Sequence, residues 1–447
     1  MNQPINDPSS PAPLSDSAAR SASPLPEITK VPTLWTFVGL VAGLGLGLLT
    51  VMRAPGALVP LLAVAEPVGD MWLRALRATI IPLVVSLLFM GVVQTVAAAR
   101  AGAMARRALG WFYLILAGGS AMAAFVVPAL LALIPSPPGA AEALRAGMAA
   151  SSAQATGSLP GVGDFVASFV PANVFAAAAN DQILPLLLFT AIFAVAAARL
   201  ANHQRENLLT FFEAVGGATL VVVGWILWTA PAGVFALSFA VAAHTGTAAI
   251  GALAHYVLIV TLTGTVMFLS AYPIAVLFGR QRLGAFARAV IPAQALALST
   301  QSSLASLPAM LGACRQLGIR DRAAEFTLPL AVALFRGTGP AMNFAVAIYL
   351  AHWLGVPVDG WHMLAGFAVA SVMSFGAVSL PGAISLVTSC GPIALAMGVP
   401  VGPLALLVAV EVLPDLMRTL GNVTLDVAVT AVVDAMPGLD DEPVASD

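Results

Sequence analysis

Long apolar segments separated by short polar ones make up most of the chain. A bilayer core is about 30 Å thick, so a helix of about 20 apolar residues crosses it. Residues 214–279 contain no Asp, Glu, Lys or Arg and are long enough for two crossings, with a turn near His244 and Thr245. Four earlier apolar segments cover residues 34–52, 72–98, 108–134 and 186–198. We therefore predict six membrane-spanning helices before Arg280.

Beyond Arg280 the apolar segments are interrupted in the middle. Non-helical backbone at membrane depth occurs only where protein or a water-filled cavity covers it. Paired interrupted segments of this kind are typical of a transporter site, whereas simple Gly/Pro kinks are the alternative. We predict two re-entrant hairpins, each followed by a further helix. The hairpins would be 284–316, with hydroxyl side chains from Ser299 to Ser306, and 361–398, with Ser379-Leu-Pro-Gly382; between them 323–353 would form a helix broken at Arg336-Gly-Thr-Gly-Pro340.

A polar stripe marks the last apolar segment, 401–435, which we predict to be one long helix kinked at Pro414. Residues 361–410 contain no Asp, Glu, Lys or Arg, and Glu411 ends that run. Charged groups at bilayer depth cost about 3 kcal/mol or more each, so they face protein or a wet cavity. A structural ion pair is one interpretation, and a site for a polar ligand or an ion is the favoured one. Spacings of three, one, three and four place the stripe on one helix face: Asp415, Arg418, Thr419, Asn422 and Asp426.

Composition agrees with a polytopic membrane protein. The chain of 447 residues is 60% hydrophobic and 9% charged, whereas a soluble domain carries about 25% charge. A net charge of -2 makes nucleic acid an unexpected partner. The two cysteines, Cys314 and Cys390, lack the spacing of a disulfide framework or a zinc site. No catalytic motif occurs in the spans, so we expect neither an enzyme nor a cofactor.

The distribution of basic residues predicts the topology. Most of the 19 Lys and Arg lie in alternate connections between the predicted spans. By the positive-inside rule both termini are cytoplasmic, in the plasma membrane or bacterial inner membrane. Residues 1–30, rich in Ser, Pro and Ala, are predicted to be a disordered cytoplasmic tail, and residues 436–447 a second, acidic tail.

Several motifs in order resemble the dicarboxylate/amino acid:cation symporter family, which includes glutamate transporters and archaeal aspartate transporters. The resemblance covers about 34–435. Asp415-Leu-Met-Arg-Thr-Leu-Gly-Asn-Val-Thr-Leu-Asp426 is similar to the family pattern D-x-x-R-T-x-x-N-x-x-x-D. Thr300–Pro308 and Leu380–Ala383 resemble the tips of the family's two hairpins. Pro171–Asn173 and Asn180–Pro185 resemble its fourth segment.

The resemblance implies an all-α fold of eight transmembrane helices plus two re-entrant hairpins, built from inverted repeats. It implies a homotrimer that works as an elevator-type transporter in membrane lipid. Residues 34–280 would be mainly scaffold and trimerisation helices, with parts of spans 3 and 6 in the transport part. Residues 281–435 would be the core transport region, with the second hairpin as the outer gate.

The resemblance also implies roles for the stripe. Asp415 would bind the substrate's α-ammonium group, Arg418 its side-chain carboxylate, and Asp426 with Asn422 a sodium ion. Together these favour an acidic amino acid such as glutamate or aspartate, with Na⁺ or H⁺ as the coupling ion. A C4-dicarboxylate, cystine, or a channel-like or non-transporting homologue are the alternatives. The remaining substrate contacts would be Thr419, Asn422, Thr338, Ser302, Ser303, Pro381 and Gly382.

Two motifs depart from the family pattern. Leu334-Phe-Arg-Gly-Thr338 stands where the family has N-M-D-G-T, and Tyr113-Leu-Ile-Leu-Ala117 stands where it has Tyr-x-x-Thr-Ser. Oxygen ligands of one family cation site are therefore absent together, and a cation needs such ligands. We hypothesise that Arg336 replaces that cation as a tethered positive charge and weakens sodium dependence. The alternative is that Arg336 points elsewhere and transport has been lost.

Overall fold

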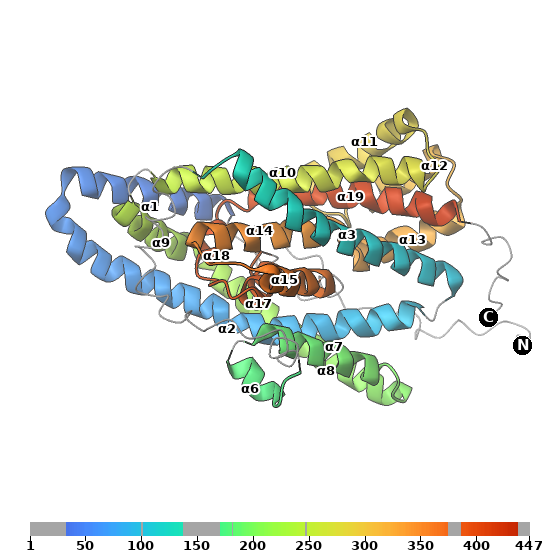
Figure 1. Ribbon diagram of the computed structural model, residues 1–447, viewed down its shortest axis with the longest axis horizontal. Helices are drawn as coiled ribbons and strands as arrows, with labels where there is room; N and C mark the ends of the chain where they lie inside the picture. The colour runs from blue at the N-terminus through green and yellow to red at the C-terminus, as the bar shows by residue number, and fades with distance from the viewer. Residues whose placement is uncertain are drawn as a thin grey trace, which may run out of the picture.

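The computed structural model describes residues 33–99, 102–136, 170–180, 182–245, 248–373 and 386–436. These residues form helices and turns, with no strand among them. Figure 1 shows an elongated bundle in which most helices run along the long axis. The predicted tail 1–30, residues 437–447 and the predicted contacts Pro381 and Gly382 lie outside the described residues.

The first half of the chain forms long apolar helices close to the predicted spans. The second span starts earlier than predicted, because α2 extends back to Leu58 with Pro67 and Pro82 inside it. The predicted turn near Thr245 is confirmed as the end of a helix. The elements are α1 (Thr33–Arg53), η1 (Pro55–Ala57), α2 (Leu58–Ala99), α3 (Ala103–Leu133), α6 (Val174–Ala179), α7 (Ile183–Ala197), α8 (Asn202–Trp228), α9 (Ala230–Thr245) and α10 (Ala248–Leu277).

The second half contains the predicted interruptions. Residues 301–306 separate two helices that contact each other, and residues 335–338 separate two more. The second break is followed at once by Gly339 and Pro340, which begin the next helix. The elements are α11 (Leu283–Thr300), α12 (Leu307–Gln316), α13 (Asp321–Leu334), α14 (Gly339–Leu354), α15 (Gly360–Met373), η2 (Leu386–Cys390), α17 (Gly391–Ala396), α18 (Leu404–Leu407) and α19 (Val412–Asp434).

The single helix predicted over 401–435 is wrong. The short α18 ends at Leu407, and α19 begins at Val412 after Glu411. Pro414 lies in the first turn of α19, where backbone N–H groups have no acceptor within the helix. The N–H that proline lacks is therefore not needed there, and Pro414 does not kink the helix. The polar stripe is therefore carried by a separate helix that begins directly after the buried Glu411.

Eight helical segments among the described residues are long and apolar enough to cross a membrane. They are not the same eight as predicted, because α7 is shorter than a span, while α11 qualifies by length and composition. The crossing predicted to end near Thr245 is divided at Thr229 into α8, which qualifies, and the shorter α9. The 18-residue α11 was predicted as one arm of a hairpin, and its path relative to a membrane stays a prediction. The integral-membrane class follows from this set of apolar helices.

Helix α19 lies in the interior of the bundle, alongside α10, as Figure 1 shows in red and yellow-green. It also contacts α11, α12, α13, α14 and α3. The side chains of α14 are almost all buried, as are those of α19 from Arg418 to Val433 apart from Leu420. The polar stripe is consequently enclosed by protein, the condition under which charged groups persist at membrane depth.

Candidate functional site

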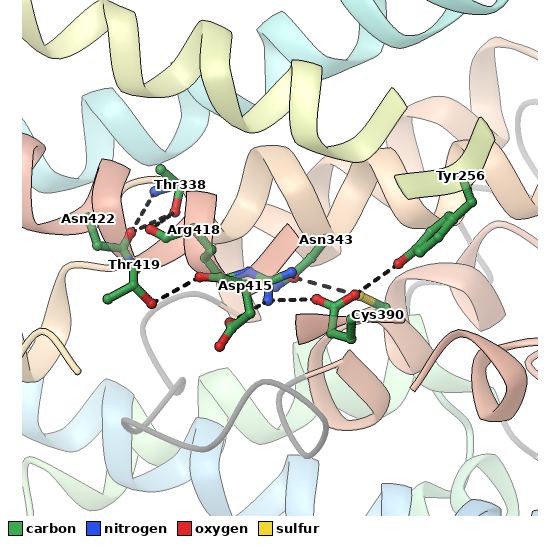
Figure 2. A network of polar contacts seen from close by, with 9 residues as sticks. Tyr256, Thr338, Asn343, Cys390, Asp415, Arg418, Thr419 and Asn422 are labelled. Atoms are coloured by element: carbon green, nitrogen blue, oxygen red, sulfur yellow. Dashed lines mark hydrogen bonds and ion pairs between the residues drawn. The ribbon is translucent and has the colours of Figure 1, made fainter. Parts of the chain in front are cut away.

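Arg418 is the centre of a buried network of polar groups on α19 (Figure 2). Its Nη1 lies 2.7 Å from Glu411 Oε1 and 2.9 Å from Asp415 Oδ1. The side chains of Arg418 and Glu411 are 3% and 1% exposed, whereas that of Asp415 is 14% exposed. One guanidinium nitrogen thus serves two carboxylates, of which Asp415 retains access to the surroundings.

The opposite edge of the guanidinium is less engaged. Arg418 Nη2 donates to Asn343 Oδ1 at 3.4 Å, a long hydrogen bond, and the thiol of Cys390 also approaches that oxygen, at 3.6 Å. Arg418 Nε is buried and has no hydrogen-bond partner among the described residues. Because a buried donor without a partner is costly, this edge is suited to a ligand that accepts from both nitrogens.

Thr338 and Asn422 join the broken helix to the stripe. The Thr338 backbone N–H and hydroxyl lie 2.9 and 2.8 Å from Asn422 Oδ1, and the hydroxyl also lies 2.9 Å from the carbonyl oxygen of Arg418. Thr338 is the first residue before α14, so its N–H has no partner within the helix. Asn422 supplies that partner and fixes the break against α19.

Two glycines allow this approach. A Cβ on Gly421 would collide with Thr338 Cγ2, and a Cβ on Gly337 would lie 2.6 Å from Leu425 Cδ1. Real Cβ atoms do not approach so closely, so a larger residue at either position would require Thr338 or Leu425 to shift. The close contact between the two segments depends on both positions having no side chain.

Asp426 lies one helical turn beyond Asn422 and is fully buried. Neither of its carboxylate oxygens has a hydrogen-bond partner among the described residues. The guanidinium of Arg336 attracts the carboxylates of Asp415 and Asp426, although no ion pair within 4.0 Å joins them in the described part of the chain. The predicted role of Arg336 as a tethered positive charge stays a prediction.

The structure brings together the stripe residues and Thr338, but it does not connect every predicted residue to them. Thr419 donates to the backbone carbonyl of Asp415 at 3.0 Å. Ser302 Oγ accepts from Ala305 N–H at 3.2 Å within its own turn, and no hydrogen bond joins it or Ser303 to α19 among the described residues. The predicted role of Asn422 at a cation is less favoured, because its carbonyl oxygen already accepts from Thr338.

Two residues of the third-span motif differ in exposure. Tyr113 is 55% exposed on α3, while Leu116 is fully buried. Leu116 stands at the position where the family pattern has a hydroxyl, so an apolar side chain faces inward there. Phe112 stacks on Phe335 beside the break, with ring centroids 4.7 Å apart. This side of the broken helix is lined by hydrocarbon rather than by oxygen.

Sequence reasoning missed four members of the network. Glu411 precedes Asp415 by four residues and Arg418 by seven, so the same spacing argument places it on the stripe. The other three come from distant elements and leave no local signal. They are Tyr256 on α10, whose hydroxyl donates to Glu411 Oε2 at 3.0 Å, Asn343 on α14 and Cys390 at the end of η2.

Comparison with known proteins gives a consistent result. The model of the sodium:dicarboxylate symporter family matches residues 33–436. The chain is 25% identical to the proton/sodium-glutamate symport protein of Bacillus subtilis (strain 168), covering 90% of this chain and 92% of that protein. It is 24% identical to the proton/glutamate-aspartate symporter of Escherichia coli (strain K12), covering 82% and 84%. It is 29% identical to the human neutral amino acid transporter B(0), covering 78% and 70%.

Proposed function

Because the chain belongs to the sodium:dicarboxylate symporter family, we propose that it is a secondary active transporter of acidic amino acids such as glutamate or aspartate. The observation that carries this proposal is the pairing of Asp415 with Arg418. Asp415 offers a partly exposed carboxylate for an ammonium group, and Arg418 offers a carboxylate its Nε, which has no hydrogen-bond partner among the described residues. A substrate with an α-ammonium group and a side-chain carboxylate matches both.

The rest of the transport machinery follows from the family. The chain works as a homotrimer in the plasma membrane or bacterial inner membrane, with both termini cytoplasmic. Helices α11 and α12 form the first re-entrant hairpin, and α15 and α17 belong to the second, whose predicted tip lies outside the described residues. The elements from α11 to α19 carry the substrate across in an elevator movement. The interior position of α19 and the breaks at 301–306 and 335–338 support this assignment.

The coupling to sodium is reduced relative to the family pattern. Arg336 supplies a fixed positive charge where a carboxylate ligand would stand, and Leu116 removes an inward hydroxyl. Asp426 keeps two buried oxygens that have no hydrogen-bond partner in the described part of the chain, so its oxygens suit a transported cation. We therefore assign at most one sodium to Asp426 and none to the site around Arg336.

Uptake into reconstituted vesicles tests both statements. Radiolabelled aspartate and glutamate are supplied with and without sodium, and succinate, cystine and alanine compete. Inhibition by the acidic amino acids alone supports them as the substrate class. Inhibition by succinate or by cystine would instead assign a C4-dicarboxylate or cystine as the substrate. A steep sodium dependence that requires several ions would contradict the role of Arg336.

Thermal unfolding gives a second measurement that needs no transport. A ligand at about 100 times its Kd stabilises the folded protein by about 2.7 kcal/mol, so an acidic amino acid should raise Tm while alanine should not. Arg336→Met serves as the matched variant, because it keeps an unbranched, mainly apolar side chain and removes the charge. We expect it to bind the same substrates with a greater demand for an added cation.

A further inference from the structure

Glu411 is the buried acid of the network that the stripe of five residues does not include. It directly precedes α19, its side chain is 1% exposed, and its two oxygens have different partners. Oε1 forms the 2.7 Å ion pair with Arg418, and Oε2 accepts from the Tyr256 hydroxyl at 3.0 Å. The inference that follows rests on the proposed function, because it concerns what happens at Glu411 when an acidic substrate binds.

The shape of the guanidinium decides where a substrate carboxylate goes. Two-point binding of a carboxylate uses parallel N–H groups, and Nε and Nη2 form such an edge. Glu411 and Asp415 both occupy Nη1, whereas Nε has no hydrogen-bond partner among the described residues and Nη2 has only the long contact with Asn343. A substrate therefore adds to Arg418 without displacing Glu411.

This addition creates an excess of negative charge. Glu411, Asp415 and Arg418 together carry one net negative charge, and a substrate carboxylate would place a third acid around one guanidinium. Carboxylates that share a buried site disfavour each other's ionised form. The substrate's own ammonium group compensates Asp415, which is partly exposed. No group of the substrate compensates Glu411, which contacts the guanidinium at Nη1 and not at the Nε–Nη2 edge.

The surroundings of Glu411 offer no second cation among the described residues. The titratable and charged groups that face it are Tyr256 from α10, Cys390 from η2, and Asp415 and Arg418 from α19. Asn343 from α14 is neutral. The Arg336 guanidinium attracts Asp415 and Asp426 instead.

The contact with Tyr256 suits either protonation state. A phenol hydroxyl donates to a carboxylate, and after rotation it accepts from a carboxylic acid. Adding a proton to Glu411 Oε2 therefore reverses the direction of the hydrogen bond without breaking it. The ion pair of Arg418 with Asp415 is unaffected, so Arg418 stays positioned.

We propose that Glu411 takes up one proton each time Arg418 binds the side-chain carboxylate of an acidic amino acid, and releases that proton when the substrate leaves. The proton enters from water on the side where the substrate binds. It forms an O–H bond at Glu411 Oε2, and the proton returns to water on the other side. Glu411 is thus the proton-binding residue of the site, while Arg418 is the substrate-binding one.

Binding measured across pH tests this proposal. Uptake of one proton with the substrate makes Kd rise about tenfold for each pH unit above the titration of the acid. Isothermal titration of aspartate into the purified full-length protein in detergent gives Kd, and titration in buffers of different ionisation enthalpy gives the protons taken up. We expect the wild type to show this slope and one proton for each aspartate bound.

Glu411→Gln is the decisive variant, since it keeps the shape and removes the titrating group. We expect its Kd for aspartate to change less than about twofold over the same pH range, with no proton uptake. The conservative variant Glu411→Asp should regain the pH dependence with a displaced midpoint. A full slope in Glu411→Gln would overturn the assignment.

Two further outcomes separate the possible failures. If the wild type binds no acidic amino acid at any pH, the proposed function fails. If it binds aspartate with a Kd independent of pH, the substrate class stands and the role of Glu411 is overturned. Should Glu411→Gln not fold, Tyr256→Phe decides the matter. Removing the Tyr256 hydroxyl must then shift the pH midpoint of aspartate binding, and an unchanged midpoint overturns the proposal.

Discussion

Two helix contacts in this molecule differ in the polar groups that they contain. Helices α1 and α9 meet through three glycines of α1 spaced by four residues, Gly39, Gly43 and Gly47. A Cβ at Gly47 would lie 2.7 Å from the carbonyl oxygen of Phe239, and one at Gly43 would lie 2.5 Å from that of Phe235. Helix α19 adds polar contacts to its neighbours, because Asn422 accepts from the Thr338 N–H and Arg418 donates to Asn343.

The difference between these contacts indicates which of them serves packing and which serves a ligand site. Lipid is as apolar as a leucine side chain, so helices in a membrane associate mainly by close packing, for which small residues suffice. The contact of α1 with α9 is formed by such close packing of glycines. Buried charges are costly and add little to association, so their concentration on α19 indicates a ligand site. The following predictions test whether the two contacts respond differently.

Replacement of Arg418 should have the largest effect. Arg418→Met leaves the buried Glu411 and the partly exposed Asp415 without their cation, which costs about 3–5 kcal/mol of unfolding free energy. Binding of acidic amino acids should also be lost. The control is Arg74→Met, because Arg74 pairs with Asp70 at 2.8 Å while its side chain is 79% exposed. An exposed pair contributes about 1 kcal/mol or less.

Unfolding in denaturant, followed by tryptophan fluorescence, measures both variants. Equal losses of stability in the two would mean that burial of the Arg418 network does not matter. Loss of stability without loss of aspartate binding would remove Arg418 from the substrate site.

The glycine contact offers a matched pair on one helix. Gly43→Ala places a methyl group against Ser238 and the backbone of α9, and overpacking of this kind costs about 1–3 kcal/mol. Gly45 has no atom within 4 Å of a Cβ, so Gly45→Ala should be neutral or stabilise by about 0.5–1 kcal/mol through helix propensity. Neither variant should change Kd for aspartate. A changed Kd in Gly43→Ala would contradict a purely structural role of the contact between α1 and α9.

The sequence permits prediction of the apolar helices and of the five-residue stripe, because both depend on local spacing. The start of α19 was not predictable in this way, since residues 401–435 are uniformly apolar up to Glu411 and only packing decides where the backbone turns. Tyr256 and Asn343 join the network from helices that contain no Asp, Glu, Lys or Arg. Their positions follow from tertiary contacts that a periodicity cannot encode.

Thr338→Val tests the link between the broken helix and the stripe. The substitution keeps the shape, removes the hydroxyl contacts with Asn422 and Arg418, and leaves the backbone N–H in place. We expect a loss of about 1 kcal/mol in stability, together with weaker aspartate binding. Thr219→Val is the control, because the Thr219 hydroxyl donates to Val215 within its own helix. Weakened binding in the control alone would contradict the assignment.

The smallest effect concerns an exposed acid, which contrasts with the buried acids of the stripe. The backbone N–H and ring of His362, with the N–H of Trp361, lower the pKa of Asp359 at the start of α15. A carboxyl whose pKa is lowered on folding adds stability above its unfolded pKa of about 3.9, and this contribution disappears as pH falls through the lower, folded value. The wild type should therefore lose more Tm than Asp359→Asn between about pH 5 and pH 3. The difference should be small, since water screens this exposed group. Equal losses of Tm in the two proteins would mean that the hydrogen bonds at Asp359 do not favour its ionised form.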